Sequence, residues 1–150
     1  MPRTFESASS NLQLFDLRRE PVLREARNWF LLEFNPSNFG EFSALAGGER
    51  NASFPMVVSY WDMAASLVTS GAIDANAFRV AHGEVFATFS KIHPYVPELR
   101  AASGEPEFCK HMETVVMAAP DTEQILTRRR DAMRAFAAKR GESEKIDSRS

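Results

Sequence analysis

Apolar residues between positions 54 and 68 recur at the spacing of an α-helix. At about 100° per residue, one face is formed by Phe54, Val57, Val58, Trp61, Ala64, Ala65 and Val68. A second apolar strip, well round the helix, consists of Met56, Tyr60, Met63 and Leu67. Because only a narrow polar sector remains, we expect this helix to be surrounded by others at the centre of the fold. Gly71 predicts its end, and Asp74 predicts the N-cap of the next helix.

The segments before this helix predict three shorter ones. Residues before about Ser10 are polar, and we expect them to be loose; a short helix follows and ends near Arg19. Pro21 is suited to a first helical turn and predicts a second helix, to about Phe34. Its expected inward residues are Val22, Leu23, Ala26, Trp29, Phe30 and Phe34, and a third helix is predicted to bury Phe39, Phe42 and Leu45.

The segments after Asp74 are also helical in pattern. One helix is predicted to run through to Ile92, with Phe78, Ala81, His82, Val85, Phe86, Phe89 and Ile92 on one side. A short helix ends near Ala102, another presents Phe108, Met112, Val115 and Val116, and the last starts after Asp121. No strand-like alternation is present, so the sequence predicts an all-α, compact bundle of about seven to eight helices around a central buried helix. We expect a single domain over residues 1–141 and a disordered charged tail over 142–150.

Composition narrows the class of protein further. The chain has 150 residues and a formal net charge of −2, which gives no reason to expect a nucleic acid or an anionic membrane as main partner. Its single cysteine, Cys109, excludes an intrachain disulfide. The N-terminus lacks the pattern of a signal peptide, and no apolar run reaches the ~20 residues of a membrane helix. We therefore expect a cytoplasmic protein without a membrane segment.

His82 is the most unusual polar residue, because its helical projection falls within an aromatic stripe. One interpretation is a titratable or ligand-binding group, with a pKa lowered by burial. The favoured interpretation is a core histidine with one hydrogen bond to a backbone carbonyl, since no second metal ligand stands three or four residues away. A ligand pocket near Trp61 and His82 stays open as an alternative, with the candidate residues Trp29, Trp61, Asp62, His82 and Arg100.

No motif identifies a catalytic set, a metal site or a cofactor. Cys109 and His111 diverge by about 200° on a helix, so they cannot easily meet as a nucleophile and its base. His82 or His93 could still serve as the base from elsewhere in the chain, but a half-buried structural thiol is favoured. Gly47 and Gly48 lack the flanking strand and the lysine of a phosphate-binding loop. We expect no cofactor, and the sequence favours a protein that is not an enzyme.

The last predicted helix carries the only basic cluster of the chain. Arg128, Arg129, Arg130 and Arg134 spread around this helix and do not form one phosphate-facing stripe, so nucleic-acid binding through Arg128–Arg134 is the weaker alternative. Apolar residues stand on the same mixed-charge background. The candidate partner-binding residues are Arg128, Arg129, Met133 and Phe136.

Several short motifs resemble an uncharacterised family of bacterial helical proteins, classed as a domain of unknown function. They are Ala26-Arg27, Tyr60-Trp61, Leu67-Val68-x-x-Gly71-x-Ile73-Asp74, Gly83, Phe89, Pro94 and Pro97-Glu98-Leu99-Arg100. The resemblance covers roughly Leu14 to Val116. It implies a helical fold, and members often carry a membrane segment ahead of the domain. It implies no activity, cofactor or catalytic residue.

These observations favour a helical interaction or regulatory module that is not an enzyme. We expect a protein partner or self-association, with the last helix as the contact surface. A small-molecule-binding protein or enzyme is the alternative from another class, and nucleic-acid binding is a third.

Overall fold

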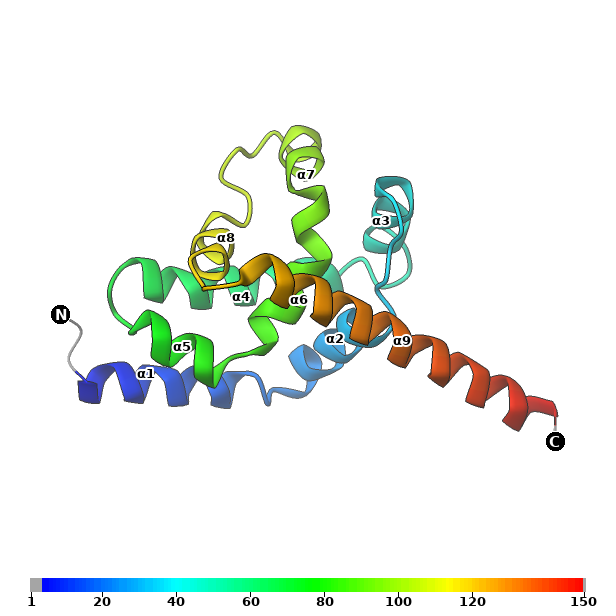
Figure 1. The fold of residues 1–150 in the computed structure, drawn as a ribbon, viewed down its shortest axis with the longest axis horizontal. Coiled ribbons are helices and arrows are strands. Elements are labelled where there is room, and N and C mark those ends of the chain that lie inside the picture. Colours follow the sequence, from blue (N-terminus) through cyan, green and yellow to red (C-terminus); the bar gives the residue numbers. More distant parts are fainter. Residues whose placement is uncertain (1–3, 150) are drawn as a thin grey trace.

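The computed structural model describes residues 4–149, which contain nine α-helices, a short 3₁₀ helix and no strand (Figure 1). In chain order the elements are α1 (Thr4–Leu17), α2 (Pro21–Leu32), α3 (Phe39–Ala46), α4 (Ser53–Thr69), α5 (Ala75–Ala81), α6 (Glu84–Ile92), η1 (His93–Tyr95), α7 (Val96–Ser103), α8 (Lys110–Met117) and α9 (Thr122–Arg149). The predicted all-α bundle is confirmed.

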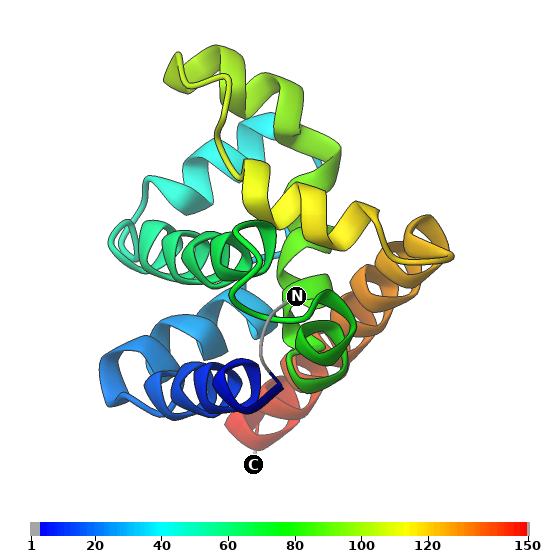
Figure 2. The same ribbon diagram turned by 90° about the vertical axis from the view of Figure 1, so that its left-hand side faces the viewer.

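Helix α4 carries much of the core, as its two apolar strips predicted. It packs against α2 on one side and α8 on the other (Figure 2). Trp61 is completely buried, and the small Ala64 and Ala65 are buried one turn further along the same face. Met63, on the second strip, is instead 42% exposed, so α4 is not enclosed all round.

Helix α6 is the most enclosed element of the fold. All residues from Val85 to Ile92 are buried, since α6 packs against α9, α8 and α2. The sequence predicted one helix from Asp74 through Ile92, and this expectation is wrong at His82 and Gly83. There, Val85 N–H donates to the His82 carbonyl and Phe86 N–H to that of Gly83, so the chain makes short turns between α5 and α6. The break directs His82 and Glu84 towards two arginines described below.

The first and the last described segments, residues 4–17 and 122–149, are helical over a greater length than their sequence indicated. Loose chain was expected before about Ser10, but residues 4–10 lie in α1, where buried Ser7 accepts a hydrogen bond of 3.0 Å from Asp74 N–H; residues 1–3 lie outside the described part of the chain. Helix α9 continues past Gly141 to Arg149, where a disordered tail was expected, and projects beyond the rest of the fold (Figure 1). Beyond Gly141 its residues are exposed, and Arg140 and Glu144 form an ion pair one turn apart.

Helix ends follow local signals closely. Gly71 has φ +86°, the left-handed conformation that ends α4, and Asp74 accepts a hydrogen bond of 2.8 Å from Ala77 N–H at the start of α5. Inward orientation is less well predicted: Val22 is 58% exposed, and Leu45 also faces solvent. Within residues 4–149, no helix combines the length and the apolar character needed to cross a membrane.

Candidate functional site

His82 lies between α5 and α6 and is completely buried. Its ring lies among aromatic rings, with centroid distances of 5.0 Å to Phe78, 6.0 Å to Trp61 and 6.1 Å to Phe15; of these three, only Phe78 belongs to the aromatic stripe predicted from the sequence. Trp61 is equally buried, so neither side chain lines a surface that a ligand can reach. The ligand pocket that the sequence left open as an alternative near Trp61 and His82 gains no support from these two buried side chains.

The hydrogen bonds of His82 go to side chains, not to the backbone carbonyl that we expected. Its Nδ1 lies 3.3 Å from Nη1 of Arg18, and its Nε2 lies 3.2 Å from Oδ1 of Asn11. A guanidinium only donates hydrogen bonds, so Nδ1 is the acceptor and the proton is on Nε2, which donates to Asn11. The arrangement thus selects one neutral tautomer of the imidazole.

Arg18 links this histidine to Glu84, which also pairs with Arg27. Arg27 donates two hydrogen bonds of 2.6 Å to the carboxylate oxygens of Glu84, and Arg18 Nη2 lies 3.6 Å from Oε1. The three side chains are only 13–14% exposed. The pKa of Arg27 is raised, mainly by its hydrogen bonds to Glu84, whereas burial lowers the pKa of Arg18. Bidentate pairing of this kind fixes α2 against the start of α6.

The titratable groups of this cluster keep one protonation state near neutral pH, and their contacts hold helices together. Burial, together with the charge of Arg18, lowers the pKa of His82 to about 4, so its imidazole is neutral above that pH. Burial also raises the pKa of Tyr60 to about 12, and its hydroxyl donates to the Leu14 carbonyl. These contacts tie α1 to α4 and to the end of α5, and α2 to α6.

The remaining ligand-binding candidates lie apart from His82. Asp62 accepts a hydrogen bond of 3.0 Å from Met112 N–H and so caps α8, which lacks a capping side chain of its own. Arg100 donates to the Phe108 carbonyl and to Glu113. Trp29 packs in the core, 5.4 Å from the ring of Phe34. The five candidates therefore do not form one cavity, and no cluster of three or more potential metal ligands occurs within residues 4–149.

Three of the four partner-binding candidates share a groove between α9, α2 and α6. Arg129, Met133 and Phe136 line it together with Leu31, Leu32, Gly83, Glu84, Ala87 and Ala132, around a volume of about 400 Å³. Phe136 is 56% exposed at its edge. Arg128 is exposed on α9 but does not line the groove.

Sequence reasoning missed Arg18, Arg27 and Glu84. One signal was present for Arg27: it stands four residues after Leu23 and three before Phe30, on the apolar face of α2. A charged residue on such a face requires a buried partner. Nothing in the sequence identifies that partner, because Glu84 lies fifty-seven residues further along the chain.

Residues 3–118 match the model of the family described as Domain of unknown function (DUF4760). No curated protein and no solved structure matches the chain. The matched region ends just before α9, so it includes the buried network but not the basic helix. Because the match covers more than half of its 150 residues, the chain belongs to the DUF4760 family.

Proposed function

We propose that this protein is a helical interaction module that self-associates through α9, with a second copy of the chain as the partner. The observation that carries the proposal is the exposed Phe136 beside an apolar groove, on a helix that projects beyond its own fold. A helix of 28 residues is about 42 Å long, and its residues 142–149 are exposed, whereas helices in proteins owe most of their stability to tertiary packing. A partner helix would supply that packing.

Charge along α9 favours an antiparallel pair. Residues 125–130 contain three arginines and no acid, whereas residues 142–147 contain Glu142, Glu144 and Asp147 against the single Lys145. Arg128 and Glu144 are each eight residues from Phe136, in opposite directions. Two antiparallel helices that meet at Phe136 thus bring the basic segment of each copy level with the acidic segment of the other. Opposite charges of this kind select orientation and partner.

A cytoplasmic location is part of the same proposal. Its support is Cys109, a free thiol that is buried at the start of α8 and has its pKa raised to about 12, first by burial. Free thiols persist in reducing compartments.

The test is the mass of the full chain in solution, by light scattering and sedimentation over a hundredfold range of concentration. We expect a concentration-dependent dimer that Phe136→Ser weakens. The matched control is Phe5→Ser, since Phe5 is 84% exposed on α1, away from the groove. A monomer at every concentration, or equal effects of the two variants, would refute self-association through α9.

Charge reversal tests the orientation separately. Glu142→Arg with Glu144→Arg should weaken the dimer, and adding Arg128→Glu with Arg129→Glu should restore it. A parallel pair predicts no such restoration, because it does not bring these two segments together.

A further inference from the structure

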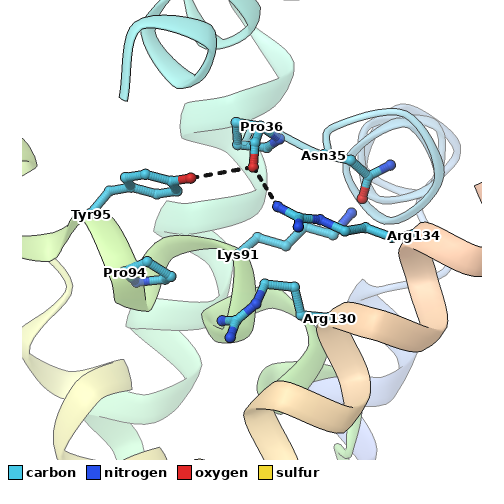
Figure 3. Close-up of a pocket in the computed structure, with 7 residues that line it drawn as sticks. All are labelled: Asn35, Pro36, Lys91, Pro94, Tyr95, Arg130 and Arg134. Carbon is cyan, nitrogen blue, oxygen red and sulfur yellow. Dashed lines mark hydrogen bonds between the residues drawn. The ribbon is translucent and has the colours of Figure 1, made fainter. Parts of the chain in front are cut away.

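A small basic pocket lies where the loop after α2 meets η1 and α9 (Figure 3). Its volume is about 190 Å³, and its lining consists of Asn35, Pro36, Lys91, Pro94, Tyr95, Arg130 and Arg134. Lys91 is 3% exposed and forms the inner wall, whereas Pro94 and Arg134 are exposed at the rim. The pocket is therefore reached from solvent and ends at a buried ammonium group.

Three cationic side chains face this pocket, and no carboxylate is among the residues that line it. Arg130 Nη1 donates to the Ser90 carbonyl at 2.9 Å, and Arg134 Nη2 donates to the Pro36 carbonyl at 2.7 Å. Each of these bonds uses one of the five N–H donors of a guanidinium. Tyr95 donates its hydroxyl to the same Pro36 carbonyl, at 3.3 Å (Figure 3). Beyond these bonds, each of the two guanidinium groups carries four further N–H donors.

Helix capping accounts for only part of this arrangement. Lys91 Nζ donates to the carbonyls of Phe30 and Leu31, at 2.6 and 2.9 Å, at the C-terminal end of α2, where a cation is stabilising. One lysine is sufficient for that role. Two further cations line the pocket beside it, and repulsion from one of them, Arg134, adds to burial in lowering the pKa of Lys91 to about 7. An anion in the pocket would remove this repulsion.

We propose that the pocket formed by Lys91, Arg130 and Arg134 binds a phosphate group, either free phosphate or a small phosphate monoester. Two guanidinium forks and an ammonium group match the oxygens of a phosphate, which Arg can bind through paired hydrogen bonds. A volume of 190 Å³ corresponds to about six water molecules, which suits a phosphate with few attached atoms. Drug-sized ligands need about 300 Å³ or more.

The experiment is calorimetric titration of the full chain at pH 7 and constant ionic strength, in a buffer without sulfonate or phosphate. The three probes are inorganic phosphate, glycerol 3-phosphate and acetate. We expect saturable binding of phosphate that Arg130→Gln and Arg134→Gln each weaken about tenfold or more, because each removes charge-assisted hydrogen bonds. Arg24→Gln is the matched control, since it removes an exposed arginine of α2 and should change nothing.

Arg134→Lys keeps a positive charge and should retain part of the affinity, which separates loss of the ligand contact from loss of folding. Helicity and the unfolding midpoint of each variant without phosphate provide the same check. Tighter binding of glycerol 3-phosphate than of phosphate identifies an ester as the ligand, and the reverse order identifies free phosphate. Absence of saturable binding, equal binding of acetate, or equal affinities of Arg24→Gln and Arg134→Gln would overturn the proposal.

Discussion

Arg27 and Glu84 form a two-bond ion pair across the contact between α2 and α6, with Nε and Nη2 each 2.6 Å from a carboxylate oxygen. Arg27 also donates from Nη1 to the Arg18 carbonyl at 2.9 Å, immediately after α1. One guanidinium therefore holds the end of α1, the body of α2 and the start of α6 in a single arrangement. Because its partner is reached only through the break at Gly83, this pair depends on the irregular chain between α5 and α6.

Replacing the carboxylate of Glu84 tests this role. Glu84→Gln leaves Arg18 and Arg27 largely buried without their counter-ion. We therefore expect it to lower the free energy of unfolding by about 2–4 kcal/mol, slightly less than the loss when a fully buried ion pair is broken. Urea unfolding at neutral pH measures the change. Glu25→Gln is the control, since Glu25 is exposed in its pair with Arg50 and should cost no more than about 0.5 kcal/mol. Equal effects would show that the Glu84 network adds no special stability.

Acid should destabilise the fold through His82. Its pKa is about 4 in the folded protein and 6.5 in the unfolded chain, so below pH 6.5 the unfolded state binds the proton first. The free energy of unfolding should therefore fall between pH 6.5 and 4, and this part of the fall should be missing in His82→Gln. Urea unfolding of the wild type and of His82→Gln at several pH values measures it. If His82→Gln lost as much stability between pH 6.5 and 4 as the wild type, burial of His82 would not be the cause of the fall.

Lys91 should affect the stability of the fold above pH 7. Its pKa is lowered from 10.5 to about 7, so between these values the unfolded lysine holds a proton that the folded one has lost. This difference in bound protons makes the free energy of unfolding rise with pH above 7. From pH 9 the raised pKa of Cys109 opposes it, which leaves pH 7–9 as the window to measure. In that window, and in phosphate-free buffer, the wild type should gain stability relative to Lys91→Met; parallel profiles would contradict the prediction.

We expect opposite effects on stability when Gly71 and Gly141 are each replaced by alanine. Gly71 has φ +86°, a conformation that is strained for alanine, so Gly71→Ala should cost about 1 kcal/mol although space is available for a Cβ. Gly141 lies within α9 with nothing near its Cβ position, so Gly141→Ala should stabilise the helix by about 1 kcal/mol. Circular dichroism should show increased helicity for Gly141→Ala. No increase would indicate that the chain beyond residue 141 is not helical in solution.

Local signals in the sequence predicted most helix boundaries. Pro21 opens α2, Gly71 ends α4 and Asp74 caps α5, because each of these depends on the φ angle or the side chain of one residue. The apolar periodicity also identified Trp61 and its neighbours as core, since a helix buries the face that its sequence makes apolar.

Only the tertiary structure decided where charged groups meet. The pairing of Arg27 with Glu84 and the convergence of Lys91 with Arg130 and Arg134 bring together residues of separate helices that stand from 39 to 57 positions apart in the chain. Helical projection describes one element at a time, so it cannot show which side chains of different helices face each other. The sequence by itself determined the helices and their apolar faces; packing of those faces determined which polar side chains became buried neighbours.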